Sequence, residues 1–327
     1  MSDIKCKKRK YEAMVTNKTI STIEDLIIII ETYDTNYYEF KQLKKIYNEL
    51  IDLSEIIGME NLKKDIVKLI LYEVQELDNS DEMAQHMCIT GGPGVGKTTI
   101  AKIIARIILK IKGWEPEKFF IATKNDLVGR YVGQTPGKVQ NFIDKCKFGC
   151  MFIDEVYSLG SSDEHDGFDK ELIDTLVHNL SENKHFVCII AGYPDETEKR
   201  FFHKNPGLKR RFGYFFNIDK YNEGELFMIL EKKIKNIRWS FDLEDIKIVE
   251  KTIALIKEKR EYFEYCGGDI QNWLAKIKVV SAQRSFCLPP KMKRIITFED
   301  IKEGFGIHMR NYKKIEKPSI SNLMMYL

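Results

Sequence analysis

A glycine-rich segment between two apolar patterns constrains the fold of this chain more than any other feature. The segment is Gly91–Thr98, which reads GGPGVGKT; a strand-like run, His86–Thr90, precedes it, and a helical pattern, Lys97–Ile111, begins at its end. Glycines allow consecutive backbone N–H groups to curl around an anion, and a helix directs its positive end at the same place. The segment matches the complete phosphate-loop pattern, so we predict a polyphosphate site inside a strand–loop–helix unit.

Short apolar runs recur along the middle of the chain and alternate with helical patterns. The runs of strand length are His86–Thr90, Phe119–Ala122, Cys150–Ile153, Phe186–Ala191 and Tyr214–Ile218. Before the third run, Thr135-Pro136 predicts a helix start, with a hydroxyl cap and a proline in the first turn. This alternation predicts an α/β fold, in which helices cover both faces of a mostly parallel sheet.

The sequence on either side of this α/β unit predicts helical regions. Residues 21–53 have helical spacing, and strands become scarce after residue 222. The later helical patterns are Leu226–Ile234, Ile246–Ile256 and Ile270–Val280, with one short strand at Ile295–Phe298. We therefore divide the 327 residues into a basic tail and helical region (1–50), an α/β domain (51–220) and a small helical domain (221–327).

Composition argues against a membrane protein and says little about nucleic acid. The formal net charge is +3, and no apolar run is long enough to span a bilayer. The seven cysteines are an odd number without a paired framework, which favours a reducing compartment. We expect a cytoplasmic protein, with a nuclear location as the alternative because of the basic run between Lys5 and Lys10.

A later apolar run ends in two carboxylates and completes the phosphate site. Met151–Ile153 is followed by Asp154 and Glu155, and ligands bind at the carboxyl ends of parallel strands. We expect Lys97 to reach the β and γ phosphates of ATP, and Thr98 and Asp154 to hold Mg²⁺. Glu155 is expected to orient and deprotonate the attacking water. The pattern predicts a Mg-dependent ATPase whose nucleotide contacts come from Gly92, Pro93, Gly94, Val95, Gly96, Lys97, Thr98 and Thr99.

With these motifs, the chain resembles the AAA+ ATPases and, more closely, the red-type rubisco activase family, also called CbxX/CfxQ-like proteins. The resemblance runs from about Ile56 to Gln283 and rests also on Ile57-Gly58-Met59-Glu60, Asp126–Thr135, Ala191-Gly192-Tyr193 and Asn205–Phe212. It implies a three-layer αβα domain with a five-stranded parallel sheet, followed by a small helical lid. It also implies a homo-oligomeric ring, usually a hexamer, with ATP at the subunit boundaries.

Two segments obtain a role from this resemblance. Ile57 and Gly58 lie in the segment that resembles the start of the AAA+ module, where adenine usually packs. Tyr131, Val132 and Gly133 resemble the aromatic-aliphatic-glycine loop that lines the channel of the ring. An aromatic side chain on a mobile loop can grip an extended peptide without reading its sequence.

Arginine and sensor positions are also implied by the resemblance. By this resemblance, Arg211 is expected to be the arginine finger that reaches a neighbour's γ phosphate, with Arg210 as its rival. Tyr193 occupies the neighbourhood of the first sensor, where most AAA+ proteins have an asparagine. The segment Cys266–Asn272, where the family has its second-sensor arginine, contains no arginine, and Arg284 lies too far along the helix to substitute.

Three functions remain open at this point. The leading hypothesis is an ATP-driven remodeller that pulls a segment of an unknown protein client through a ring, with residues 1–50 as the expected recognition region. A second is a motor on DNA or RNA, for which Lys124 and Lys138 lie near the pore segment, although the near-neutral charge disfavours it. A third is a slow nucleotide-dependent assembly switch, which the missing lid arginine favours.

Overall fold

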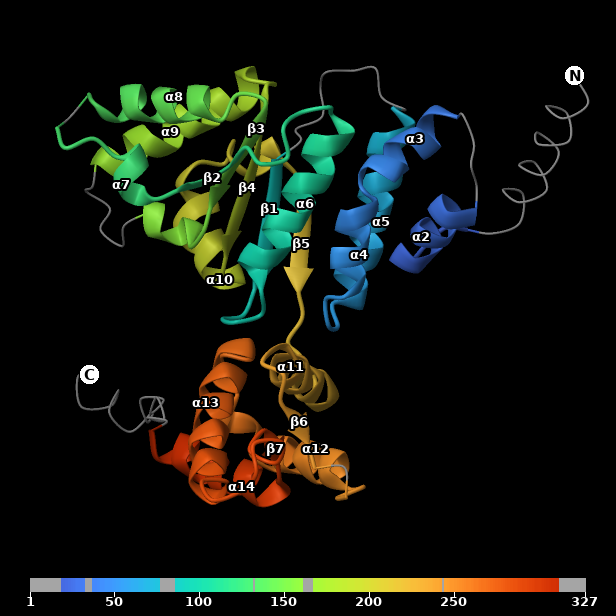
Figure 1. The fold of residues 1–327 in the computed structure, drawn as a ribbon. Helices are drawn as coiled ribbons and strands as arrows, with labels where there is room; N and C mark the ends of the chain where they lie inside the picture. The colour runs from blue at the N-terminus through green and yellow to red at the C-terminus, as the bar shows by residue number, and fades with distance from the viewer. Residues whose placement is uncertain are drawn as a thin grey trace, which may run out of the picture. The chain divides into compact units, whose positions relative to one another are not determined.

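The computed structural model describes residues 19–32, 37–76, 86–131, 133–160, 167–242 and 244–311 (Figure 1). The chain forms two compact units. The first comprises Met1–Gly92 and Gly96–Asp219, and the second comprises Lys220–Leu327 together with Pro93–Val95 of the glycine-rich segment. The described part of each unit contains its own set of fully buried apolar side chains.

A five-stranded parallel sheet forms the centre of the first unit. Its strand order is β2-β3-β4-β1-β5, and every neighbouring pair is parallel. The strands are β1 (His86–Gly91), β2 (Phe119–Ala122), β3 (Gly149–Ile153), β4 (Phe186–Gly192) and β5 (Phe212–Ile218). The predicted strands and the parallel sheet are confirmed. Because the strands are parallel, their carboxyl ends lie along one edge of the sheet, and the loops after them share that edge.

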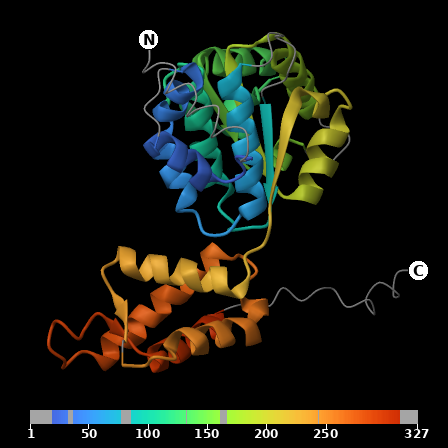
Figure 2. The same ribbon diagram turned by 90° about the vertical axis from the view of Figure 1, so that its right-hand side faces the viewer.

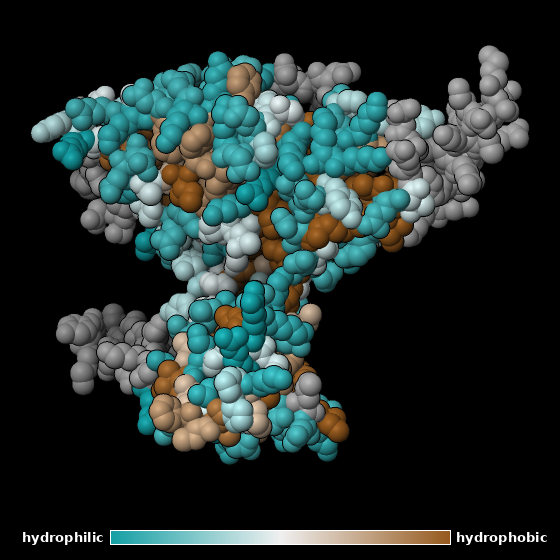
Figure 3. Space-filling model, in the orientation of Figure 1, coloured by the Kyte–Doolittle hydropathy of each residue, from teal (hydrophilic) through white to brown (hydrophobic). Residues whose placement is uncertain are grey.

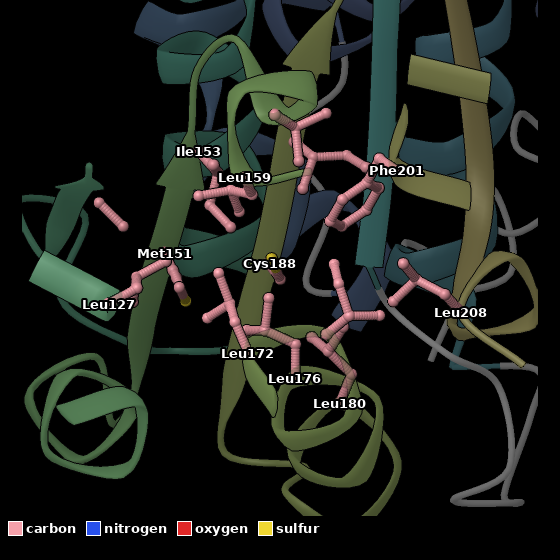
Figure 4. Close-up of a cluster of buried hydrophobic side chains, with 14 of the residues drawn as sticks. Leu127, Met151, Ile153, Leu159, Leu172, Leu176, Leu180, Cys188, Phe201 and Leu208 are labelled. Atoms are coloured by element: carbon pink, nitrogen blue, oxygen red, sulfur yellow. The ribbon is translucent and has the colours of Figure 1, made fainter. Parts of the chain in front are cut away.

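Helices cover both faces of this sheet, so the unit has three layers (Figure 2). On one face, α6 packs against β1, β3 and β4, and α5 packs against α6 and β5. On the other face, Figure 4 shows Met151, Ile153 and Cys188 of the sheet facing apolar side chains of α9. The helices are α5 (Glu60–Gln75), α6 (Lys97–Ile111), α7 (Lys124–Leu127), α8 (Thr135–Lys145), α9 (Gly167–Glu182) and α10 (Pro194–Glu196).

Before α5, the described residues of the first unit form three further helices. They are α2 (Ile23–Thr32), α3 (Tyr38–Lys45) and α4 (Tyr47–Ser54), and the predicted helical region is therefore interrupted at Ile46. Leu50 and Leu53 of α4 are fully buried. Glu49, also buried, accepts a 2.7 Å ion-paired hydrogen bond from Lys110 of α6. This pair and the apolar contacts around it attach the N-terminal helices to the helical layer over the sheet.

The second unit is mainly helical, as predicted. It contains α11 (Glu223–Asn236), α12 (Ile248–Glu258), α13 (Gly267–Arg284) and α14 (Phe298–Asn311), with a two-stranded parallel sheet of β6 (Ser240–Phe241) and β7 (Ile295–Ile296). The helix α14 was not predicted. It is held by the core around Trp273, whose indole N–H donates to Ile301 O at 3.3 Å and whose ring meets Phe305 edge-on.

One local prediction is wrong. Thr135 does not cap α8; it is the first residue of the helix, and Gln134 occupies the cap position without a side-chain hydrogen bond. The Thr135 hydroxyl instead accepts a hydrogen bond from the backbone N–H of Gly129, 3.1 Å away. The hydroxyl therefore stabilises the loop before the helix. A sequence pattern alone does not distinguish a hydroxyl that caps a helix from one that bonds to the preceding loop.

The surface seen in Figure 3 is mainly hydrophilic, with apolar side chains exposed in small groups. In the described part of the chain, no helix is both long enough and apolar enough to cross a membrane.

Candidate active site

The glycine-rich loop joins the end of β1 to the start of α6. Gly94 and Gly96 have positive φ angles of 67° and 97°, a conformation that glycine adopts at little cost, and Gly96 stands at the cap position of α6. The Lys97 ammonium donates to Gly91 O at 3.1 Å and to Gly92 O at 2.8 Å. The loop thus folds around its own lysine, which lies where the helix directs its positive end.

A hydroxyl and a carboxylate meet beside this loop. The Thr98 hydroxyl donates to Asp154 Oδ2 at 2.7 Å, and the backbone N–H of Glu155 donates to Asp154 Oδ1 at 3.0 Å. Thr98 belongs to the first turn of α6 and Asp154 follows β3, so the two residues come from separate elements at the same edge of the sheet. Sequence reasoning predicted both residues at one site, and the structure brings them together.

The Thr98–Asp154 pair has the donor atoms of a magnesium site. Mg²⁺ is usually held by one or two protein oxygens together with phosphates and waters. Among the described residues, no group of three or more His, Cys, Asp or Glu could hold a metal. The hydroxyl oxygen of Thr98 and the carboxylate of Asp154 fit an ion that also takes oxygen ligands from phosphates and waters.

Burial and the neighbouring charges act in opposite directions on the pKa of Lys97. Burial lowers the pKa of the half-buried Lys97 ammonium, while the negative charges of Asp154 and Glu155 raise it, and the net shift is downward. Glu155 is exposed and has a left-handed backbone conformation, with φ 49°. The site therefore combines one cation, one carboxylate tied by hydrogen bonds and one carboxylate that faces solvent.

Two stacked tyrosines lie beside Lys97. Tyr193, which follows β4, has its ring centroid 4.7 Å from the Lys97 ammonium. The ring of Tyr157 stacks on that of Tyr193, with centroids 5.3 Å apart and planes at 18°. The pKa of the Tyr157 phenol is raised well above its usual value, first by burial, then by the charge of Glu155, and also by hydrogen bonding with the Tyr193 and Glu155 side chains. Sequence reasoning proposed Tyr193 and missed Tyr157, whose signal in the sequence was an aromatic residue two positions after Glu155.

The segment predicted as a pore loop is anchored at its base and exposed at its tip. Lys138 of α8 donates at 2.9 Å to the carbonyl oxygens of Asn125 and Val128. The Tyr131 side chain is 71% exposed, and Gly133 has a φ of 86° with open space on its Cβ side. Val132, the middle residue of the predicted loop, lies outside the described residues.

Arg210 and Arg211 lie together in the short turn η4 (Lys209–Arg211) before β5. Arg210 is exposed, whereas Arg211 is half-buried, and its Nε is enclosed with no hydrogen-bond partner among the described residues. Lys209 fixes the turn through Glu198, with Nζ–Oε distances of 2.9 Å. The structure thus separates the two candidate arginines by exposure.

The two remaining predicted positions lie away from these groups in sequence. Ile57 is half-buried, and Gly58 has a φ of 67° in the turn that precedes α5. In the second unit, Arg284 at the end of α13 pairs with the buried carboxylate of Asp300 at 2.8 Å. Arg284 therefore already has a structural partner within its own unit.

Comparison with known proteins places this geometry in a family. A family model described as "ATPase family associated with various cellular activities (AAA)" matches residues 87–205. A CfxQ-like protein of Acanthamoeba polyphaga mimivirus is 34% identical over 88% of this chain and 70% of its own length. The stage V sporulation protein K of Bacillus subtilis is 34% identical, over 69% of this chain and 71% of its own length.

Other relatives extend the comparison. The chloroplastic ribulose bisphosphate carboxylase/oxygenase activase of Cyanidioschyzon merolae is 31% identical, over 77% of this chain and 88% of its own length. Among solved structures, the RuvB Holliday junction branch migration motor of Thermotoga maritima aligns with a TM-score of 0.54 at 17% identity, over 78% of this chain and 71% of its own. The RuvB likeness concerns the fold alone.

Proposed function

Because the chain belongs to the CfxQ-like family of AAA ATPases, we propose that it hydrolyses ATP with Mg²⁺ in a ring of its own copies and uses that energy to remodel a protein client. The observation that carries the proposal is the 2.7 Å contact between Thr98 and Asp154 beside the loop that holds Lys97. These groups supply a hydroxyl, a carboxylate and a cation at one edge of the sheet, which is the set that phosphoryl transfer from ATP requires.

Each residue of the site has a separate task in this reaction. The loop amides and Lys97 bind the β and γ phosphates, and Thr98 and Asp154 hold Mg²⁺, which when bound neutralises charge on those phosphates. Glu155 orients a water and accepts its proton as the water oxygen bonds to the γ phosphorus. The bond between the γ phosphorus and the β–γ bridging oxygen breaks, and ADP and inorganic phosphate leave.

The ring is proposed by analogy with the family, whose ATP sites lie at the subunit boundaries. An arginine from a neighbouring copy would stabilise charge on the transferring phosphoryl group. Arg211 is our candidate, and the unpartnered position of its Nε within the described residues supports a guanidinium that completes its contacts elsewhere. Arg210, which is exposed, is the alternative. We propose a hexamer by analogy with the family.

Client handling is assigned to the exposed Tyr131 on its anchored loop. An aromatic side chain at the tip of a loop can contact an extended peptide, and Gly133 at a positive φ allows the loop to change direction. We place this activity in the cytoplasm, with a nuclear location as the alternative. Residues 1–50 remain the proposed region for client recognition. We keep the proposed division of the chain into this N-terminal region, an α/β domain (51–220) and a helical lid domain (221–327).

A nucleic-acid motor is less well supported than a protein remodeller. Lys138, one of the two lysines near the pore segment, donates to two backbone carbonyls and so has a structural task. A slow assembly switch is the second candidate, because Cys266–Asn272 at the start of α13 contains no arginine to link the lid to nucleotide. Turnover measured together with oligomer size separates this switch from a motor: negligible turnover with ATP-dependent assembly favours the switch.

The proposed ATPase is tested with Glu155→Gln. We expect this variant to bind ATP like the wild type but to lose at least a hundredfold in turnover, because general-base catalysis contributes on the order of 10²–10⁴ in rate. Phosphate release measures turnover, and calorimetric titration with ATP measures binding. Glu117→Gln, an exposed glutamate before β2, is the matched control and should keep wild-type turnover. Wild-type turnover by Glu155→Gln would show that another group is the base.

A further inference from the structure

The proposed mechanism leaves the pair of stacked tyrosines without a task. Tyr193 follows β4 and lies against the Lys97 ammonium, 4.7 Å from ring centroid to Nζ. Tyr157 belongs to the turn η1 (Val156–Leu159), two residues after Glu155, and stacks on Tyr193 at 5.3 Å. The pair therefore connects the lysine of the phosphate loop with the turn that carries the proposed base.

The turn that carries Tyr157 is fixed on several sides. Glu155 begins it with a φ of 49°, and the backbone N–H of Ser158 closes it by donating to Glu155 O at 2.7 Å. A Cβ on Gly160, directly after the turn, would overlap the carbonyl oxygen of Arg200. The turn therefore packs closely on the backbone of the π-helical segment η2 (Thr197–Phe201).

The end of β4 packs against another side of the turn that carries Tyr157. A Cβ on Gly192 would lie 3.3 Å from Cδ1 of Tyr157 and would collide with the hydroxyl of Thr197. The backbone N–H of Thr197 in turn donates to Tyr193 O at 2.9 Å. The absence of a side chain at Gly192 thus lets the Tyr157 ring lie against the strand end. Turns of the π type are uncommon and occur frequently at functional sites.

We propose that Tyr157 is a positioning residue: its hydroxyl holds the Glu155 carboxylate, and its ring, stacked on Tyr193, fixes that carboxylate relative to Lys97. The proposal deepens the proposed function and rests on it. Glu155 needs such a contact because its side chain is exposed, and an exposed carboxylate samples many rotamers. A base that is misplaced by about 1 Å can lose on the order of a hundredfold in rate.

The first test is Tyr157→Phe, which keeps the stacked ring and removes only the hydroxyl. We expect kcat for ATP hydrolysis to fall by about ten- to a hundredfold, while KM and the affinity for ADP stay unchanged. ADP affinity also reports that the variant is folded. Tyr214→Phe is the matched control, because Tyr214 is a half-buried tyrosine of β5 whose ring also stacks on a neighbour, Phe216; it should keep wild-type kcat. An unchanged kcat in Tyr157→Phe refutes the positioning role.

The second test asks whether the hydroxyl acts through Glu155. Single-turnover hydrolysis is compared in Glu155→Gln and in the double variant Glu155→Gln/Tyr157→Phe. If Tyr157 acts only by placing the carboxylate, the second substitution changes the residual rate by less than about twofold, because effects within one unit are not additive. A loss in the double variant as large as in Tyr157→Phe alone refutes the proposal. If the wild type itself shows no hydrolysis, the proposed function fails first, and the two failures are distinguishable.

Discussion

His86 at the start of β1 makes the stability of the sheet depend on pH. The side chain is 3% exposed, Nδ1 accepts from the backbone N–H of Cys188 at 3.0 Å, and Nε2 lies 3.1 Å from Leu180 O, to which it donates as the neutral tautomer. Burial among Phe186, Phe212 and the sheet lowers the pKa of His86 from 6.5 to about 4, against the smaller opposing effect of the Leu180 carbonyl. His86 is therefore neutral in the folded chain at neutral pH.

The sign of the effect follows from proton binding. Between pH 6.5 and about 4, the unfolded chain carries a proton on His86 and the folded chain does not. The unfolded state then binds more protons, so the free energy of unfolding decreases as the pH falls. The difference between the pKa of His86 in the unfolded and the folded chain lowers the free energy of unfolding by about 3 kcal/mol once the pH is below both values. At pH 5 the loss is about 2 kcal/mol.

This prediction is tested with His86→Asn, which keeps a hydrogen-bonding side chain and cannot titrate in this range. Urea unfolding followed by circular dichroism at pH 7 and pH 5 gives the loss of stability for each protein. The wild type should lose about 2 kcal/mol more than His86→Asn on this change of pH. His178→Asn, which alters an exposed histidine of α9, is the control and should keep the wild-type loss. Equal losses in the wild type and His86→Asn would refute the reasoning.

Two further predictions concern the proposed ring. Arg211→Ala should keep nucleotide affinity and lose at least a hundredfold in the rate of phosphate release, because the guanidinium acts only on the transferring phosphoryl group. Full turnover by this variant, together with a loss of turnover in Arg210→Ala, would assign the role to Arg210. Tyr131→Ala should keep ATP turnover but lose remodelling of a client, since Tyr131 is 71% exposed and belongs to the predicted pore loop rather than to the phosphate loop. Client unfolding measured by hydrogen exchange checks this, and unchanged remodelling would contradict the assignment.

Much of the sheet could be predicted from the sequence because its signals are local. Each strand buried on both faces is a short apolar run, and each run is followed by glycine or aspartate. The phosphate loop is equally local, since its glycines, lysine and hydroxyl are consecutive. Asp154 and Glu155 could be placed at the same edge because parallel strands align their carboxyl ends.

Of the features that were missed, one had a local signal and the others depend on contacts with other segments. The helix α14 packs on Trp273 through its own Phe305. Its start carries an overlooked capping box, in which the Asp300 carboxylate accepts from the Thr297 N–H at 3.0 Å and the Thr297 hydroxyl accepts from the Asp300 N–H at 3.3 Å. The Thr135 hydroxyl bonds to a loop six residues earlier rather than to its own helix. Tyr157 obtains its place from the end of β4 and from Gly192, thirty-five residues away in the chain. No local pattern contains such information.

The central claim is that the loop around Lys97 binds the phosphates of ATP. Calorimetric titration of the purified protein with Mg²⁺ and a non-hydrolysable ATP analogue tests it most directly, beside Lys97→Ala and the control Lys102→Ala, which alters an exposed lysine of the same helix. We predict saturable binding by the wild type and by Lys102→Ala, and at least tenfold weaker binding by Lys97→Ala. Folded wild-type protein without affinity for the analogue, or equal affinity in Lys97→Ala, would contradict the account.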